Sequence, residues 1–393
     1  MAIEQTNKPS EMEMRSVTVL GSTGSIGENT IDLIRRSPGR FNVTALTANR
    51  NVSYLVEQAI EFKAEMAVVA DESCYSELKE GLSGTGIKVA AGADAVVEAA
   101  SLQSDFVMAS IVGTAGLEPT FKAVQRGTTL GLANKECLVS AGDIMMSEIG
   151  RCDSTLIPVD SEHSAIYQVF DFDEPSKIDR IILTASGGPF RQTPLEEMAN
   201  MAPEQAVAHP NWDMGAKISI DSATMMNKGL ELIEAYHLFP VAEEQIEILV
   251  HPQSVVHSLV DYVDGSVLAQ MGTPDMRTPI SYALSWPARM QTPAERLRLE
   301  DIRELTFEAP DLIRFPALRL AREALKKGGC APIFLNAANE IAVERFLCGK
   351  IGFLDIIDIV EKTLEKTPSG TLHSLSDVLG ADQNAREIAR GLL

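Results

Sequence analysis

The chain has 393 residues, 45% of them hydrophobic and 23% charged, which are the proportions of a globular protein long enough for two or three domains. Its formal net charge of −21 argues against nucleic acid or an anionic membrane surface as a partner, because either would require a broad basic face. No run of about 20 apolar residues offers a membrane-spanning helix, so no membrane association is expected.

The N-terminal segment and the cysteines favour a cytoplasmic address. Residues 1–14 carry neither the apolar segment of a signal peptide nor the pattern of a transit peptide, and we expect them to form a tail. The five cysteines are far apart in the sequence and include no CxxC pair. Neither structural disulfides nor a thiolate zinc site is therefore expected.

A Rossmann-like α/β domain is predicted over residues 15–152. The β-branched run at residues 16–20 predicts a strand, and the glycine-rich loop GSTGSIG (21–27) and a helical pattern follow it. Further strands are predicted at residues 41–46, 64–70, 104–112 and 128–134. Strands that alternate with helices indicate a parallel sheet with helices on both faces.

The glycine-rich loop is a candidate dinucleotide site. A loop that leads from a first strand into a helix can hold a phosphate, because free backbone N–H groups and the helix dipole favour an anion. The alternative is a tight turn that uses glycine only for its backbone freedom. At the end of the second predicted strand, where NAD-binding proteins place a carboxylate, the sequence reads Asn49-Arg50-Asn51. Arg50 favours NADPH, whose 2′-phosphate it can pair with, although an exposed surface arginine is the alternative reading.

A second α/β domain is predicted over residues 153–290 and a C-terminal helical bundle over 312–393, with a linker at 291–311. Strands are predicted at 154–159, 178–186, 245–250 and 266–271, and C-terminal helices at 316–327, 333–348, 353–366 and 380–392. Residues 186–216 form a stretch too long for a structural connection. We interpret this stretch as a lid.

Carboxylates in two places suggest a metal site. Asp160 and Glu162 follow a predicted strand and lie two residues apart, so in an extended chain they would point to the same side. Asn227, Lys228 and Glu231 have the three- and four-residue spacing of neighbours on a helix. Three carboxylates without a cysteine predict an oxygen-rich site for Mg²⁺ or Mn²⁺. Helix caps and a surface ion pair are the alternatives.

Hydroxyl groups near a lysine suggest a phosphate site. Ser186 ends a predicted strand beside two glycines, and Ser222 lies shortly before Lys228. A phosphate monoester suits such donors, with the lysine supplying charge and Asn227 and the two serines directed hydrogen bonds. Turn capping is the alternative for both serines. Trp212, inside the predicted lid, is interpreted as a cover that excludes water, and packing in a core is its alternative.

Ordered motifs along nearly the whole chain resemble the 1-deoxy-D-xylulose 5-phosphate reductoisomerase family. They are GSTGSIG (21–27), LANKE (132–136), PVDSEH (158–163), SGGPF (186–190), HPNW (209–212), IDSATMMNKGLE (220–231), HPQSV (251–255), PDMRTP (274–279) and LNAANE (335–340). The resemblance implies an enzyme of the non-mevalonate route to isoprenoid precursors. Its expected reaction is the NADPH- and divalent-metal-dependent isomerisation and reduction of 1-deoxy-D-xylulose 5-phosphate to 2-C-methyl-D-erythritol 4-phosphate, and a homodimer is expected.

The resemblance also implies site residues. The metal ligands would be Asp160, Glu162 and Glu231, which together with Lys135 would be the catalytic residues. The substrate would be bound by Lys135, Ser161, Glu162, Ser186, His209, Ser222, Asn227, Lys228 and Glu231, with Trp212 as the covering side chain. NADPH would be bound by Thr23, Gly24, Ser25, Ile26, Asn49, Arg50, Asn51, Asn134, Glu136 and Gly215. Many family members have Gly-Lys-Asn at 49–51, so the charge near the 2′-phosphate is kept while its geometry differs.

Two other functions remain open at this point. A simpler NADPH-dependent reductase of a carbonyl or semialdehyde substrate would need no rearrangement, and metal dependence separates it from the first reading. A nucleotide-sensing protein could keep the dinucleotide domain without catalysis. The carboxylates and the lid stretch argue against such a sensor, which requires neither.

Overall fold

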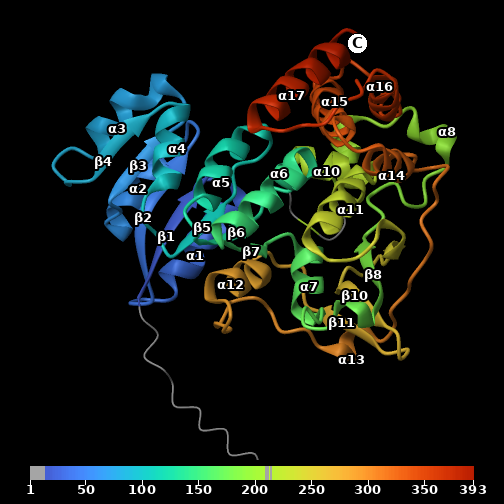
Figure 1. The fold of residues 1–393 in the computed structure, drawn as a ribbon, viewed down its shortest axis with the longest axis horizontal. Coiled ribbons are helices and arrows are strands. Elements are labelled where there is room, and N and C mark those ends of the chain that lie inside the picture. Colours follow the sequence, from blue (N-terminus) through green and yellow to red (C-terminus); the bar gives the residue numbers. More distant parts are fainter. Residues whose placement is uncertain (1–13, 209–211, 213–214) are drawn as a thin grey trace, which may run out of the picture.

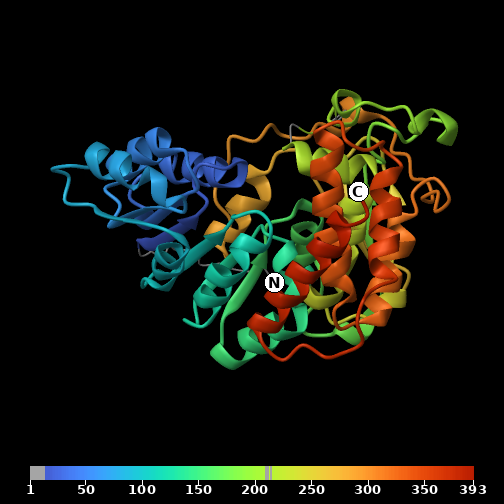
Figure 2. The ribbon, with the colours of Figure 1, turned by 90° about the horizontal axis from the view of Figure 1, so that it is seen from above.

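The computed structural model describes residues 14–208, 212 and 215–393, so all but the last residue of the predicted N-terminal tail lies outside the described residues. Two β-sheets organise the chain (Figure 1). The first sheet lies at one end of the molecule and the C-terminal helices at the other, and a view turned by 90° shows the same separation (Figure 2). Among the described helices, none combines the length and apolar character needed to cross a membrane.

The first sheet has seven parallel strands. In spatial order they are β4 (Lys88–Ala91), β3 (Met66–Val69), β2 (Phe41–Ala48), β1 (Arg15–Leu20), β5 (Phe106–Ala109), β6 (Thr129–Leu132) and β7 (Thr155–Pro158). The helices that alternate with them are α1 (Ser25–Arg35), α2 (Val52–Phe62), α3 (Tyr75–Gly81), α4 (Ala93–Ser101), α5 (Leu117–Val124) and α6 (Glu136–Cys152).

Burial on both faces explains why β3 (MAVV) and β5 (FVMA) are continuous apolar runs rather than alternating ones. Val17 and Val19 of β1 pack with α1 and α2, whereas Leu20 packs with α5 and α6 on the other face. The predicted Rossmann-like sheet is confirmed. The four-residue strand β4 was not predicted, because its sequence KVAA carries too short an apolar pattern.

The seventh strand of the first sheet lies beyond the predicted boundary of the first domain. Strand β7 pairs in parallel with β6 and therefore extends the first sheet, although the sequence places it in the second domain. The first sheet therefore extends past the boundary predicted after residue 152. A strand's own pattern shows that it is a strand but does not reveal its partner.

The second sheet is smaller and mixed, with the order β11-β10-β8-β9. Its strands are β8 (Ile178–Ala185), β9 (Ile246–Val250), β10 (Val256–Tyr262) and β11 (Val267–Met271). Strand β10, which pairs with both β8 and β11, was not predicted, because His257, Ser258 and Asp261 interrupt its apolar pattern. The associated helices are α7 (Ser161–Val169), α8 (Leu195–Met198), α9 (Pro203–Ala206), α10 (Ala216–Ala223) and α11 (Met226–Leu238).

One segment of the predicted second domain packs against the first sheet, and one segment of the predicted linker pairs with the second sheet. Helix α12 (Arg277–Ser285) packs its Ile280 and Leu284 into the core of the first sheet, beside α1. The predicted linker contains the short helix α13 (Leu299–Ile302) and a residue, Glu308, that forms an antiparallel bridge with Val250 of β9. The linker is therefore attached to the second sheet.

The C-terminal segment is helical, as predicted, and it shares one core with the second sheet. Its helices are α14 (Ala317–Lys327), α15 (Ala331–Leu347), α16 (Asp355–Leu364) and α17 (Leu375–Arg390). Helix α15 packs against α6, α10, α14, α16 and α17, and residues on all its sides are buried. A helix that is buried all round is a core element, so any polar side chain on α15 needs a partner inside the protein.

Candidate active site

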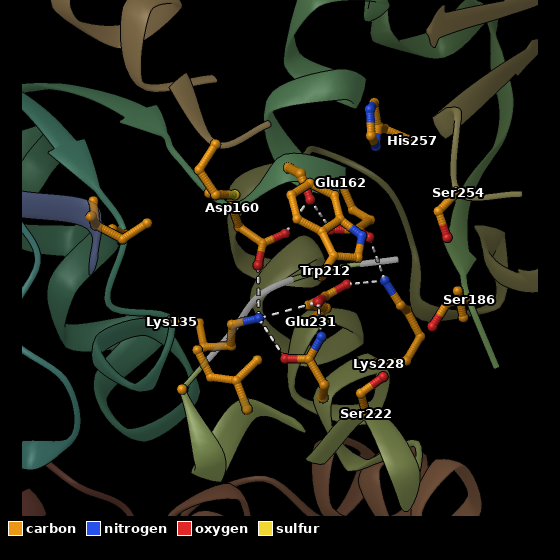
Figure 3. A pocket seen from close by; sticks show the side chains of 18 of the residues that line it. Lys135, Asp160, Glu162, Ser186, Trp212, Ser222, Lys228, Glu231, Ser254 and His257 are labelled. Atoms are coloured by element: carbon orange, nitrogen blue, oxygen red, sulfur yellow. Dashed lines mark hydrogen bonds and ion pairs between the residues drawn. The ribbon is translucent and has the colours of Figure 1, made fainter. Parts of the chain in front are cut away.

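A cavity of about 340 Å³ opens where the first sheet meets the second (Figure 3). The glycine loop, the strand ends of both sheets and helices α10 and α11 line it. The predicted site residues among its lining are Gly24, Ser25, Ile26, Lys135, Asp160, Ser161, Glu162, Ser186, Trp212, Gly215, Ser222, Asn227, Lys228 and Glu231. The fold thus brings residues up to about 200 positions apart into one cavity.

The first sheet contributes Lys135 and Asp160 from the carboxyl ends of adjacent strands. Lys135 follows β6 and is the N-cap residue of α6, and Asp160 follows β7 and is the N-cap residue of α7. The side chain of Asp160 accepts a hydrogen bond from the backbone N–H of Glu162 at 3.2 Å. The chain is therefore already turning into a helix at these carboxylates, and the extended geometry assumed for Asp160 and Glu162 is wrong.

Helix α11 contributes Asn227, Lys228 and Glu231 from its first turns. Met225, with a φ of 62°, separates α10 from α11 in a left-handed conformation and lets the second helix start in a new direction. Glu231 is 1% exposed at its side chain and Lys228 is 4% exposed. Neither side chain is a surface charge, so the surface ion pair considered from the sequence is excluded.

The ammonium group of Lys135 lies among acceptors from both parts of the fold. Its Nζ donates to Asp160 Oδ2 at 2.7 Å, to Asn227 Oδ1 at 2.8 Å and to Glu231 Oε1 at 3.1 Å. Burial by itself lowers the pKa of Lys135, but Asp160 and Glu231 raise it well above its usual value. The lysine is consequently a fixed positive charge.

Lys228 neutralises the other side of the cluster of three carboxylates, Asp160, Glu162 and Glu231. Its Nζ lies 3.2 Å from Glu162 Oε1 and also pairs with Glu231. Burial and the neighbouring charge of Glu231 raise the pKa of Glu162 to about 7, against the opposing effect of Lys228. Burial also acts to raise the pKa of Asp160, but Lys135, His163 and Lys228 together outweigh it and lower that pKa. Three carboxylates against two lysines leave an excess of negative charge.

The carboxylates fit a hard divalent cation. Asp160, Glu162 and Glu231 each offer a carboxylate oxygen, and these three atoms lie within 4.8 Å of one another. An all-oxygen donor set with excess negative charge is what Mg²⁺ and Mn²⁺ prefer. A second group of the same spacing joins Asp160 to His163 and Glu234; in it His163 Nδ1 lies 3.1 Å from Glu234 Oε2, and Nε2 lies 2.8 Å from the backbone oxygen of Glu231.

The opposite end of the cavity carries hydroxyl groups. Figure 3 shows Ser186, Ser222 and Ser254 around Lys228, with Glu231 between this lysine and Lys135. Gly188 makes this arrangement possible, because a Cβ atom there would lie 2.5 Å from the backbone oxygen of Ser222. A lysine surrounded by hydroxyl groups can bind a phosphate.

The lining residues that were not among the predicted site residues include Ser254 and His257. Ser254 lies between β9 and β10 and His257 on β10. The motif HPQSV (251–255) was noticed in the sequence, but it contains no charged group to suggest a role. Burial lowers the pKa of His257 to about 4, so this histidine is neutral at pH 7.

The glycine loop has the geometry of a dinucleotide turn. Gly24 is the N-cap residue of α1, and Gly24, Ser25 and Ile26 line the cavity. A Cβ atom on Gly27 would lie 2.1 Å from the backbone oxygen of Gly21, so only glycine lets the helix start so close to the strand end. The N-terminal N–H groups of α1 therefore belong to residues that line the cavity, and they can bind an anion.

Other predicted cofactor residues lie outside the cavity lining. Asn49, Arg50 and Asn51 are exposed, and Asn51 caps α2 by accepting a hydrogen bond from the backbone N–H of Tyr54. The remaining members are half-buried Thr23 and the buried residues Asn134 and Glu136. Their contacts with NADPH stay predictions, and the predicted substrate residue His209 lies outside the described residues.

A class of protein follows from this architecture: a dinucleotide-dependent oxidoreductase whose cofactor turn shares its cavity with a metal-binding carboxylate group. Family models agree on a particular family. The model for 1-deoxy-D-xylulose 5-phosphate reductoisomerase matches residues 17–142, and models for C-terminal domains of the same enzyme match residues 156–239 and 271–388. The chain belongs to the 1-deoxy-D-xylulose 5-phosphate reductoisomerase family.

Relatives of this name resemble the chain over almost its full length. The protein from Rhodospirillum centenum is 61% identical over 376 residues, which cover 96% of this chain and 94% of that protein. The solved enzyme from Zymomonas mobilis, in complex with NADPH, has a TM-score of 0.92 and 57% identity and covers 96% of this chain and 99% of its own. A solved DOX-P reductoisomerase in complex with NADPH, fosmidomycin and magnesium has a TM-score of 0.92 and 44% identity, covering 96% of this chain and 98% of its own.

The burial of Glu231 between two lysines generates a prediction about metal binding. Glu231→Gln removes one anionic ligand and should weaken Mn²⁺ binding by about tenfold or more, while NADPH binding stays within about twofold. Titration of Mn²⁺ by electron paramagnetic resonance and of NADPH by fluorescence measures both. The exposed Glu365, changed to Gln, is the matched control. Unchanged Mn²⁺ affinity in Glu231→Gln would remove this residue from the metal site.

Proposed function

We propose that this chain catalyses the NADPH- and divalent-metal-dependent isomerisation and reduction of 1-deoxy-D-xylulose 5-phosphate to 2-C-methyl-D-erythritol 4-phosphate. This reaction belongs to the non-mevalonate route to isoprenoid precursors. The observation that carries the proposal is that one cavity contains the dinucleotide turn, the cluster of three carboxylates and the hydroxyl-lined end. A reductase without rearrangement would have no use for the carboxylates, and a nucleotide sensor would have no use for the hydroxyl-lined end.

The substrate phosphate would bind at the hydroxyl-lined end. Lys228 supplies the positive charge there, and Ser186, Ser222 and Asn227 supply directed hydrogen bonds. The sugar would then extend toward the carboxylates, because Glu231 lies between Lys228 and Lys135. This orientation places the reacting carbons between the metal ligands and the dinucleotide turn.

The reaction needs charge stabilisation at the sugar oxygens. A divalent cation, either Mg²⁺ or Mn²⁺, held by Asp160, Glu162 and Glu231 supplies Lewis-acid polarisation, and NADPH supplies the hydride. Lys135 holds a fixed positive charge beside the same carboxylates and can stabilise developing negative charge on a substrate oxygen. Ser161, which donates to Glu162 at 2.7 Å, orients that carboxylate.

A direct assay tests the proposed function. NADPH consumption monitored at 340 nm should require both 1-deoxy-D-xylulose 5-phosphate and a divalent cation. Chelation should abolish turnover, and added Mg²⁺ or Mn²⁺ should restore it. Full activity in excess chelator would exclude the metal from the mechanism, and turnover of a plain aldehyde in preference to the sugar phosphate would favour the simpler reductase.

Arg50 supports the preference for NADPH over NADH. The sequence showed the residues next to Arg50 in the chain but not its ion-pair partner. No carboxylate follows β2, but the structure brings Asp71, just after β3, to 2.5 Å from Arg50 Nε. Asp71 also accepts hydrogen bonds from Ser73, so it is already engaged. We propose that Arg50, which is 75% exposed, keeps its outer guanidinium face for the 2′-phosphate.

Cofactor preference should depend on this arginine. The unmodified enzyme should use NADPH at least about tenfold more efficiently than NADH, and Arg50→Ala should narrow this ratio by weakening NADPH alone, because only NADPH has the 2′-phosphate. Values of kcat/KM for both cofactors measure the effect. Arg36→Ala, which removes an exposed arginine at the C-cap of α1 that pairs with Asp32, is the control. Equal use of both cofactors by the unmodified enzyme would contradict the proposal.

We also propose that residues 186–216 cover the bound substrate. Ser186 at the start of this stretch lines the cavity, and so does Trp212, whose ring lies 6.1 Å from that of His257. A large aromatic side chain over the cavity would exclude water from the reacting carbons.

We further propose that the enzyme is cytoplasmic and forms a homodimer. Strand β11 is an edge of the second sheet, and its Val267 and Leu268 are 52% and 48% exposed. The opposite edge strand, β9, is partly covered by the bridge to Glu308. An exposed apolar edge strand is a template for pairing with another copy of the same strand.

The proposed homodimer predicts an effect of charge on this edge. The unmodified protein should elute as a dimer in size-exclusion chromatography with light scattering, and Leu268→Lys should shift it toward a monomer, because lysine on an edge strand blocks pairing. Leu379→Lys, at a 38% exposed leucine of α17, should leave the dimer intact. A monomeric unmodified protein would reject the dimer, and a dimeric Leu268→Lys variant would place the interface elsewhere.

A further inference from the structure

The motif LNAANE (335–340) has no role in the site described above, although it lies in the middle of α15. Asn339 of this motif is fully buried, and its Nδ2 donates to Asp221 Oδ1 at 2.7 Å. Asp221 belongs to α10, the helix that also carries Ser222 into the cavity. The C-terminal helices are thus connected by a buried hydrogen bond to the helix that contributes a phosphate donor.

Lys217 continues this connection toward the cofactor domain. Its Nζ lies 2.9 Å from Asp221 Oδ2 and 3.2 Å from Glu136 Oε1. Glu136 is the first residue of α6 and directly follows Lys135, whose ammonium group contacts the carboxylates. A single ammonium group therefore joins the start of α10 to the start of α6.

The two ion pairs that Lys217 makes with Asp221 and Glu136 form a bridge between α10 and α6. The charges in this bridge stabilise one another. The side chains of Glu136 and Asp221 are 7% and 2% exposed, so each carboxylate has lost most of its hydration. Burial by itself lowers the pKa of Lys217, but Asp221 and Glu136 raise it, and the lysine stays charged. Removing one partner from a buried ion pair leaves an uncompensated charge, which favours rearrangement of the helices that carry it.

A second connection runs from the same motif to the cofactor domain. Glu340 pairs with Arg386 of α17 at 2.5 Å, and Arg386 Nη2 donates to Thr114 Oγ1 at 3.2 Å. Thr114 follows the loop after β5 in which Ser110 and Val112 line the cavity. Helix α15 is therefore connected to the substrate side of the active site through the buried Asn339, and to the cofactor side through the half-buried pair of Glu340 and Arg386.

We propose that Lys217 and Asn339 are positioning residues for the reaction, which fix the starts of α6 and α10 relative to one another and so place Lys135 and Ser222 against the substrate. The inference rests on the proposed function and extends it. It gives the C-terminal helices a part in catalysis, because α15 fixes α10 through Asn339. Neither residue lines the cavity, so both act through the residues they hold.

The variant Lys217→Met tests the bridge, since it keeps the length of the side chain and removes its charge. We expect kcat at saturating substrate to fall by about tenfold or more, because small displacements of catalytic groups are costly. The Kd for NADPH alone should change by a smaller factor than kcat, because Gly24–Ile26 at the start of α1 lie outside the bridge, although Glu136, a predicted cofactor residue, belongs to it. Lys217→Arg, which restores the charge, should recover most of kcat. Lys362→Met, at an exposed lysine of α16, is the control and should keep full activity.

A purely structural role would lower the melting temperature and leave kcat unchanged. Asn339→Ala removes the buried amide group and with it the hydrogen bond to Asp221, and it should lower kcat by about threefold or more. If Lys217→Met does not fold, kcat of Asn339→Ala alone tests whether these residues position the catalytic groups. Values of kcat within twofold of the unmodified enzyme, or no recovery in Lys217→Arg relative to Lys217→Met, overturn the inference. Absence of turnover in the unmodified enzyme rejects the proposed function and the inference with it, whereas normal turnover in all variants rejects the inference alone.

Discussion

The burial of Asp160, Glu162 and Glu231 together with Lys135 and Lys228 is the constraint on which the rest of the structure depends. Moving each ionised group out of water costs on the order of several kcal/mol, and only close partners and hydrogen bonds offset that cost. The partners come from the ends of β6 and β7 and from α11. The two sheets must therefore meet in one arrangement for the charges to be paired, and that arrangement creates the cavity.

A second set of charges with little exposure to water lies further from the cavity. Lys217, Glu136 and Asp221 are also charges placed on separate elements and held away from water, and Asn339 completes their hydrogen bonds from the C-terminal helices. Helix α15 is buried on all its sides, so its asparagines have no access to solvent and must find protein partners. Polar groups inside a core specify how elements pack more sharply than apolar contacts do, because an apolar contact tolerates sliding.

Structural features that depend on short stretches of chain were predictable from the sequence, whereas features that depend on contacts between distant segments were not. The glycine loop, the apolar strands and the C-terminal helices were predictable because each leaves its own pattern within a few residues. The sharing of β7 with the first sheet, the pairing of Arg50 with Asp71 and the bridge at Lys217 were not, because each joins segments with no common pattern. Asp160 and Glu162 were correctly brought together for an incorrect reason, since a helix cap rather than an extended chain brings them close.

The charge arrangement also couples the two ends of the cavity. Lys228, which we propose binds the phosphate, is engaged by Glu162 and Glu231, and Lys135 is engaged by Asp160 and Glu231. A divalent cation among these carboxylates would take over their neutralisation, so both ammonium groups would become available to anionic oxygens of the substrate. Cation and phosphate would then each strengthen the binding of the other, as thermodynamic linkage requires of any such coupling. A chain with a net charge of −21 can in this way attract an anionic sugar, because the positive charge is supplied locally rather than by the surface as a whole.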